Sequence, residues 1–276
     1  MYTLNCRGRL LVLDQPVVMG IINLTPDSFY AGSRSAQLDA VLFKAEQLLT
    51  AGAVILDIGA QSTRPGSNYL TADEEWARLA PVLPTLTEHF PQAYFSVDTF
   101  HASVAQQAYE AGVHLINDIS FGMLDNEMIP VVAKSGLPYI GMHMKGSPQT
   151  MQSLANYDDL LLEITDFFSQ RIAACRAAGI KDLILDPGFG FAKTREHNFQ
   201  LLNRMQELQV FELPLLAGLS RKSMITKTLG ITADEALNGT TVLNTVALQK
   251  GATILRVHDP KPAVEAIRLL TKLTDS

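Results

Sequence analysis

The sequence predicts an α/β fold in which eight strands and the helices between them close into a (β/α)8 barrel. Eight short apolar runs alternate with segments of helical periodicity, which is typical of a parallel sheet. Each apolar run turns polar at its C-terminal end, and in a barrel those ends meet at one mouth. An open, doubly wound sheet is the alternative. The regular repetition and the absence of a glycine-rich dinucleotide loop favour closure.

The eight predicted strands can be read in order along the chain. They are VVMGIIN ending at Asn23, VILDIGA before 62–64, YFSVDT with Asp98, LIND with Asn117, PYIGMHMK with His143, LILDPGFGF with Asp186, LLAGLSRKS with 220–223, and ILRVHD with Arg256 and His258. We expect these polar side chains to lie together and to form the functional site.

The predicted helices lie between the strands. They cover 38–52, 72–89, 101–112, 127–136, 158–179, 197–210, 234–250 and 260–273, with a further helical turn beginning at 220–223. In the first of them Leu38, Val41, Ala45 and Leu48 form one apolar stripe. Residues 1–15 do not fit the repeat and predict a β-hairpin that closes the N-terminal end of the barrel. No linker divides the chain, so we expect one domain over 1–276.

Composition excludes several classes of protein. The net charge of −6 argues against a nucleic-acid binder, whose surface would be basic. No apolar run approaches the roughly 20 residues that span a bilayer, and the N-terminus does not resemble a signal peptide. Cys6 and Cys175 are far apart and outside any CxxC spacing, so a reducing, cytoplasmic compartment fits.

The last two strands predict an anion site. Arg256 and His258 are two residues apart on a strand and therefore point to the same side, where they can hold an anion. Ser220 is a plausible helix N-cap. Arg221 and Lys222 would then lie in the first turn, where basic residues oppose the helix dipole and so suggest a bound anion.

Three acids lie inside apolar strands, and each needs a hydrogen-bond donor. They are Asp57, Asp98 and Asp186. They can pair with an Arg or Lys of the barrel, or accept paired N–H groups from a ligand. Carboxylates together with Asn117 and Lys222 suit a pterin-like or purine-like ring, and they also suit many other polar ligands.

The loops after the first two strands are long and polar, as mobile covers of a site often are. The second contains Thr63, Arg64 and Pro65. No HxH or HxxxH spacing supports zinc. A hard cation such as Mg²⁺ would need only one or two protein oxygens plus ligand phosphates, and Asn23 could supply one.

From about residue 17 to the C-terminus the chain resembles the dihydropteroate synthase family. The resemblance lies in MGIINLTPDSF, DIGAQSTRPG, SVDT, INDIS, MHMKGSPQTMQ, LDPGFGFAKT, GLSRKSMI and LRVHD. It implies a (β/α)8 transferase of folate synthesis that joins (7,8-dihydropterin-6-yl)methyl diphosphate to 4-aminobenzoate, through a pterin-methyl cation. It also implies a homodimer and inhibition by sulfonamides.

The resemblance implies a role for each matching residue. By this resemblance, the pterin is bound by Asp98, Asn117, Asp186 and Lys222. The diphosphate is bound by Arg256, His258 and Thr63. Aminobenzoate binding falls to Arg64, Pro65, Phe191, Lys222 and Ser223, and Mg²⁺ binding to Asn23. The catalytic residues are Asp98, Lys222, Arg256 and His258.

The chain departs from the family pattern in its loops. Gln61 stands where glutamate is common, and Ala31 and Ser33 replace an acid and a glycine. Two other readings remain: a folate-dependent methyltransferase with a similar barrel, and a catalytically silent paralogue. The first would not need the anion-binding residues, and the second would not need to retain Asp98, Lys222 and Arg256.

Overall fold

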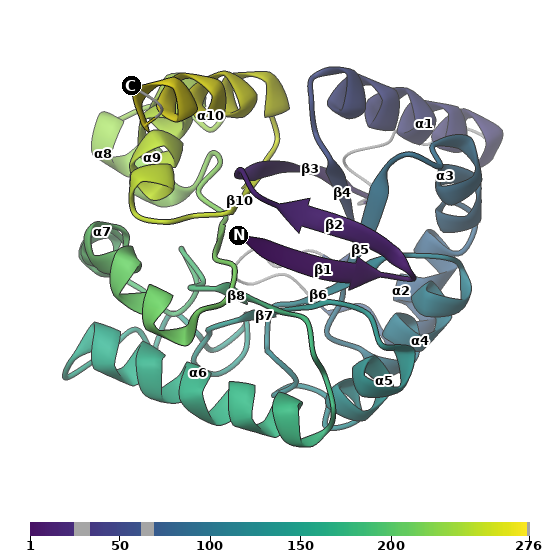
Figure 1. Cartoon of the computed structure of the whole chain (residues 1–276), viewed down its shortest axis with the longest axis horizontal. Coiled ribbons are helices and arrows are strands. Elements are labelled where there is room, and N and C mark those ends of the chain that lie inside the picture. The colour runs from purple at the N-terminus through teal and green to yellow at the C-terminus, as the bar shows by residue number, and fades with distance from the viewer. Residues whose placement is uncertain (25–33, 62–68, 275–276) are drawn as a thin grey trace.

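The computed structural model describes residues 1–24, 34–61 and 69–274, and shows a barrel of parallel strands ringed by helices (Figure 1). The barrel strands are β3 (Val17–Asn23), β4 (Ile55–Gly59), β5 (Tyr94–Asp98), β6 (Leu115–Asp118), β7 (Tyr139–Met142), β8 (Leu183–Asp186), β9 (Leu216–Ala217) and β10 (Ile254–Val257). They follow one another in the order β8-β7-β6-β5-β4-β3-β10-β9. A parallel bridge between Leu185 and Leu215 joins the two ends. The predicted closed barrel is therefore confirmed.

Alternation along each strand separates an outer apolar face from an inner face. On β4, Leu56 and Ile58 pack into the helix layer, whereas Ile55 belongs to the barrel interior. Because side chains alternate, Asp57 shares the inner face with Ile55, one step nearer the mouth. The register places Asp57 beside Ser96 of β5. A polar layer thus lies directly above the apolar layer.

The helices agree with the prediction except in one region. They are α1 (Arg34–Thr50), α2 (Ala72–Leu79), α3 (Leu83–His89), α4 (Ala102–Glu110), α5 (Met128–Ser135), α6 (Leu160–Ala177), α7 (Arg195–Arg204), α8 (Ser223–Leu229), α9 (Leu237–Gln249) and α10 (Pro260–Thr274), and a 3₁₀ helix, Met205–Phe211, follows α7.

The single helix predicted over 72–89 is wrong, because the segment forms two helices. Thr71 begins α2 with a capping box to Glu74. Pro81 follows the end of α2, and Pro84 occupies the first turn of α3. Proline lacks the N–H that a helix interior requires, so the helix stops and restarts.

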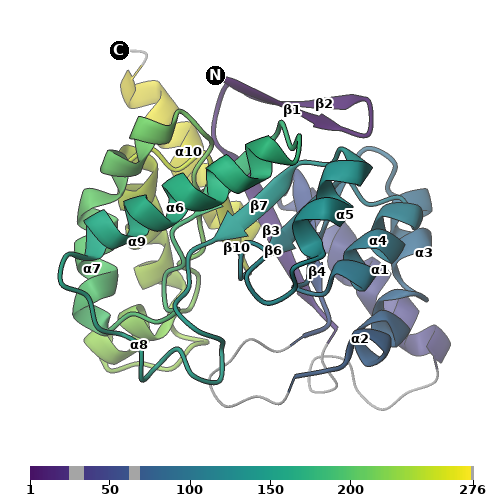
Figure 2. The same ribbon diagram turned by 90° about the horizontal axis from the view of Figure 1, so that it is seen from below.

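The N-terminal hairpin closes one end of the barrel, as predicted. Strand β1 (Tyr2–Cys6) pairs antiparallel with β2 (Arg9–Leu13) around a turn in which Arg7 and Gly8 both have positive φ. Leu4, Cys6, Leu11 and Leu13 pack on the inner apolar residues of all eight barrel strands. Figure 2 shows the hairpin lying across that end of the barrel.

Two further observations bear on the expected class of protein. Within the described part of the chain, no helix has both the length and the apolar character needed to cross a membrane. Cys6 and Cys175 are both buried and unpaired.

Leu11→Ala should destabilise the protein, because the Leu11 side chain is 4% exposed and plugs the barrel floor. We expect the free energy of unfolding to fall by about 2–5 kcal/mol. Leu10→Ala, on the same strand but 59% exposed, is the matched control and should cost less than about 0.5 kcal/mol. Urea unfolding of both variants is the measurement, and equal losses would show that the hairpin does not seal the barrel.

Candidate active site

The mouth of the barrel gathers most of the predicted site residues. Asn23, Asp98, Asn117, Asp186, Arg256 and His258 lie at the C-terminal ends of barrel strands, and Phe191, Lys222 and Ser223 lie on the segments that follow β8 and β9. Thr63, Arg64 and Pro65 lie outside the described residues, as do Ala31 and Ser33. Their predicted roles stay predictions.

Arg256 forms the centre of this site by bridging two carboxylates. Its Nε donates to Asp57 Oδ2 at 2.6 Å, and its Nη2 donates to Asp98 Oδ2 at 2.7 Å. Asp57 is fully buried, so the ion pair compensates a charge that would otherwise be costly. Burial alone would lower the pKa of the Arg256 guanidinium, but the two aspartates raise it above its usual value.

Burial and the neighbouring charges shift the pKa of Asp98 in opposite directions. Burial raises the pKa of the Asp98 carboxyl to about 7, although Arg256 pulls it down; Asp57, Asp118 and Asp186 also raise it. A carboxyl of this kind changes charge near neutral pH, as acid–base groups of active sites often do. The site therefore holds a carboxylate whose charge depends on its occupant.

Asp57 belongs to the site, although the set of binding residues taken from the sequence did not include it. Its Oδ2 also accepts from Asn117 Nδ2 at 3.0 Å. Its Oδ1 and the neighbouring Ser96 Oγ are buried without a hydrogen-bond partner among the described residues. The available signal was an acid at an inward position of an apolar strand, which requires a donor. The hydrogen bond from Asn117 Nδ2 to Asp57 also orients the Asn117 amide, whose Oδ1 remains available as an acceptor.

Asp186 and Lys222 carry the other opposite charges of the mouth, and each shifts the pKa of the other. Burial raises the pKa of Asp186, against the opposing charge of Lys222. Burial lowers the pKa of Lys222 to about 8, against the opposing charge of Asp186. The Lys222 ammonium donates to the Phe189 carbonyl and lies 4.9 Å from the centre of the Phe191 ring. Gly188 N donates to Asp186 Oδ1 at 2.8 Å and fixes that carboxylate.

The interpretation of Ser220 as a helix N-cap is wrong, because the cap position of α8 is Lys222. Ser220 Oγ instead accepts from the His258 backbone N–H at 3.3 Å and lies 3.0 Å from His258 Nδ1. The hydroxyl hydrogen is then free to donate to Nδ1, which leaves the ring proton on Nε2. Burial, together with Arg256 and Arg221, lowers the pKa of His258 to about 4. The ring is therefore a neutral N–H donor at pH 7.

Arg221 was interpreted as part of an anion site, and the structure gives it another role. Its guanidinium makes a forked pair with Asp259 at 3.0–3.1 Å and reaches Asp234 at 3.2 Å. The residue has a φ of 58°, in the left-handed region. Arg221 thus fixes the turn between β9 and α8, and Lys222 remains the basic residue that faces the other site charges.

The remaining positions lie at the rim. Asn23 ends β3 with an exposed side chain, and Ser223 begins α8, also exposed. Gln61 is 8% exposed, and its Oε1 accepts from Leu70 N at 3.0 Å. It therefore ties the end of β4 to the segment before α2. Nowhere in the described residues do three His, Cys, Asp or Glu side chains cluster as metal ligands.

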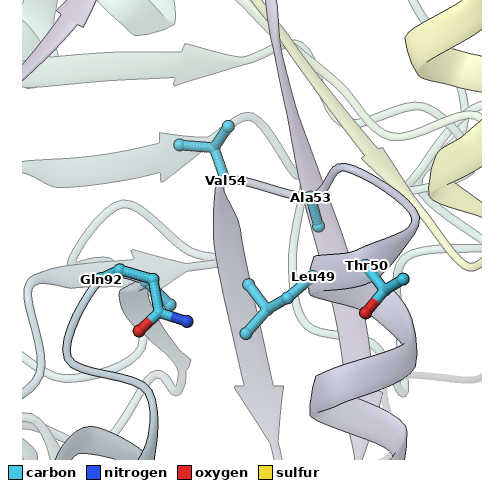
Figure 3. Close-up of a pocket in the computed structure, with 6 residues that line it drawn as sticks. Leu49, Thr50, Ala53, Val54 and Gln92 are labelled. Carbon is cyan, nitrogen blue, oxygen red and sulfur yellow. The ribbon is translucent and has the colours of Figure 1, made fainter.

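A hollow of about 410 Å³ lies at the opposite end of the strands (Figure 3). It is lined by Leu49, Thr50, Ala53, Val54, Gln92 and Ala93. None of these side chains is charged. The hollow therefore lacks the chemistry that is gathered at the mouth.

Comparison with known proteins agrees with this site. A model of the family described as "Pterin binding enzyme" matches residues 19–258. The dihydropteroate synthase of Escherichia coli K12 is 43% identical over 267 residues, covering 96% of this chain and 94% of its own. That of Haemophilus influenzae is 41% identical over 258 residues, covering 93% of each chain.

Solved structures give the same result. The Yersinia pestis dihydropteroate synthase in complex with a sulfonamide drug superposes with a TM-score of 0.93 at 44% identity, over 100% of both chains. The Xanthomonas albilineans dihydropteroate synthase with 4-aminobenzoic acid superposes with a TM-score of 0.92 at 37% identity, over 99% of this chain and 98% of that one.

His258 should remain neutral well below pH 6, with its proton on Nε2, because burial and two arginines oppose protonation. Imidazole ¹⁵N shifts followed from pH 8 to pH 4 measure both the pKa and the tautomer. Ser220→Ala should mix the tautomers, because Nδ1 loses its donor. His114, which is half-buried in the barrel wall, serves as an internal control and should not respond to Ser220→Ala. A His258 titration near 6.5 would contradict this assignment.

Proposed function

Because the chain belongs to the dihydropteroate synthase family of pterin-binding enzymes, we propose that it condenses (7,8-dihydropterin-6-yl)methyl diphosphate with 4-aminobenzoate, giving 7,8-dihydropteroate and diphosphate. The observation that carries the proposal is the cluster of Arg256, Asp57 and Asp98 in a mouth that also holds Asp186 and Lys222. This arrangement offers anion-binding donors and ring-binding acceptors in one mouth.

The pterin ring is complementary to the inner groups. Its amino group and ring N–H can donate side by side to the Asp186 carboxylate, and its carbonyl can accept from the Lys222 ammonium. Asn117 is held by Asp57, so it offers its Oδ1 as an acceptor for a further N–H of the ring. Asp98 then faces the same substrate from β5.

The diphosphate is complementary to the rim. Arg256 uses Nε and one Nη2 hydrogen on the aspartates, so its remaining N–H groups can bind phosphate oxygens. His258 adds a neutral Nε2–H donor, and Thr63 belongs to the same set by family resemblance. These donors stabilise the charge that grows on the leaving group.

The reaction follows from these placements. The C–O bond to diphosphate breaks, and its electron pair leaves with the diphosphate. The pterin-methyl cation that results is stabilised by the nearby Asp98 carboxylate. The arylamine nitrogen then forms the new C–N bond and loses a proton. We assign its pocket to Phe191, Lys222 and Ser223 and, by family resemblance, to Arg64 and Pro65, which lie outside the described residues.

Mg²⁺ fits the donors present. No cluster of acids in the described residues could hold an ion alone, and the Asn23 side chain is the oxygen donor predicted for it at the rim. A hard cation held by one protein oxygen and by substrate phosphates matches such a site. When bound, the ion neutralises phosphate charge.

A homodimer and a cytoplasmic location complete the proposal. The two unpaired cysteines support the latter.

One assay tests the function. Purified protein receives the pterin diphosphate, 4-aminobenzoate and Mg²⁺, and both diphosphate release and dihydropteroate are followed. Matched appearance of the two products is expected. Binding of pterin without product under every metal condition would sink the synthase proposal and favour a silent paralogue.

Arg256→Gln should lower kcat/KM for the pterin diphosphate by about 10²–10³-fold, because the leaving group loses its forked donor. Affinity for a pterin without diphosphate should fall by a smaller factor, because Asp57 and Asp98 lose their paired charge whereas Asp186 and Lys222 are retained. Arg204→Gln is the control, because Arg204 makes an exposed pair with Glu207 far from the mouth. Steady-state kinetics and pterin titration measure both effects. Equal loss of both would show that the anion role is misassigned.

The pH profile of kcat/KM for the pterin diphosphate should be bell-shaped. Asp98 must be a carboxylate, so activity falls as pH drops through about 7, where Asp98 gains a proton. Lys222 must be an ammonium, so activity falls as pH rises through about 8. Asp98→Asn should abolish the acid limb and leave the alkaline limb in place. A flat profile from pH 6 to 9 would refute these assignments.

A further inference from the structure

Lys193 is a buried lysine that the proposed reaction does not use. It is 4% exposed and lies at the end of the loop between β8 and α7. Its Nζ contacts three acceptors: His143 Nδ1 at 2.9 Å, the Gly188 carbonyl at 3.0 Å and the Phe191 carbonyl at 3.1 Å. Three donors thus meet three acceptors, which is the full capacity of an ammonium group.

Burial and the neighbouring charges act on the Lys193 ammonium in opposite directions. Burial lowers the pKa of Lys193 to about 7; Asp186 raises it, and Lys222 and Lys145 lower it. Burial, followed by Lys193 and Lys145, holds the pKa of His143 well below its usual value. His143 is therefore neutral, and its Nδ1 can accept the lysine hydrogen. Lys193 thus links the end of β7 to the loop after β8.

The loop over 187–193 needs such an anchor because its backbone is irregular. Gly188, Gly190 and Ala192 all have positive φ, and for Ala192 this conformation is strained. A Cβ at Gly188 would lie 2.0 Å from the His143 carbonyl oxygen, so the loop packs tightly on β7. Tyr157 supplies a second anchor, because its hydroxyl donates to the Ala192 carbonyl at 2.8 Å.

The loop contributes more to one substrate pocket than to the other. Of the proposed ring-binding groups, Asp98, Asn117 and Asp186 lie on barrel strands, and Lys222, which serves both substrates, precedes α8. The Phe191 ring, by contrast, lies on the loop, as does the Phe189 carbonyl that holds Lys222. A displaced loop would therefore move the aminobenzoate wall first.

We propose that Lys193 is a positioning residue that shapes the 4-aminobenzoate pocket by locking the 187–193 loop through its three hydrogen bonds. The inference rests on the proposed function for the identity of this substrate. Lys193 itself touches neither reactant, and it acts through Phe191 and Lys222.

Lys193→Met, which keeps the length of the side chain and removes its donors, is the principal test. We expect KM for 4-aminobenzoate to rise by about tenfold or more, because a loosened loop misplaces the pocket wall. KM for the pterin diphosphate should rise by a smaller factor, because Asp186 and Lys222 contact the loop but do not lie on it. Lys134→Met on α5, where the lysine is exposed, is the control and should change neither value.

Tyr157→Phe is a second variant that removes the other anchor of the same loop. It should shift KM for aminobenzoate in the same direction by a smaller factor, and it keeps the test valid if Lys193→Met does not fold. Equal rises in both KM values, or a loss confined to kcat and thermal stability, would overturn the proposal, because either result describes a residue that only packs.

Hydrogen exchange separates this inference from the proposed function. Lys193→Met should speed exchange at the Gly188 and Gly190 amides, which donate to Asp186 and Asn198 in the intact loop. This measurement needs no turnover. Unchanged protection at both amides would refute the locking role even in a protein that fails the synthase assay.

Discussion

The structure depends on one buried arginine held between two buried carboxylates. Arg256 reaches from β10 to Asp57 on β4 and Asp98 on β5, with β3 lying between β10 and β4. A charge inside a barrel costs several kcal/mol unless it is paired and hydrogen-bonded. The pairing makes a polar layer tolerable directly above an apolar one. The hairpin packs below that apolar layer, so among the described residues the polar layer faces the opposite end, the charged mouth.

That constraint also explains the electrostatics of the mouth. Burial raises the pKa of Asp98 and Asp186 and lowers those of Lys222 and His258. Opposite charges nearby offset part of the shifts of Asp98 and Lys222, whose pKa values are about 7 and about 8. A substrate with negative charge can therefore add to these pairings, through the N–H groups of Arg256 that the aspartates leave unused. The charge state of these side chains and the affinity of the site for its substrate therefore depend on each other.

The limits of sequence reasoning are visible at particular residues. The barrel, the hairpin and the ends of most helices follow from local patterns, because apolar alternation, glycine stops and acidic first turns act over a few residues. The break at Pro81 and Pro84 was readable in the same way and was missed. Ser220 and Arg221 resembled a capped, anion-binding turn, yet their partners His258 and Asp259 lie 38 residues away. Lys193 carried no local signal, because its acceptors include His143, 50 residues earlier.

The sequence alone determined that inward acids and bases would collect at the carboxyl ends of eight strands, because the two-residue period of a strand sets which face each side chain occupies. It also determined the family, through long motifs in a conserved order. Tertiary structure alone decided which charge pairs with which. Arg256 and Asp57 are 199 residues apart along the chain, and only closure of the barrel brings them to 2.6 Å. Pairing energies depend on distance and on exclusion of water, and neither is encoded in a local pattern.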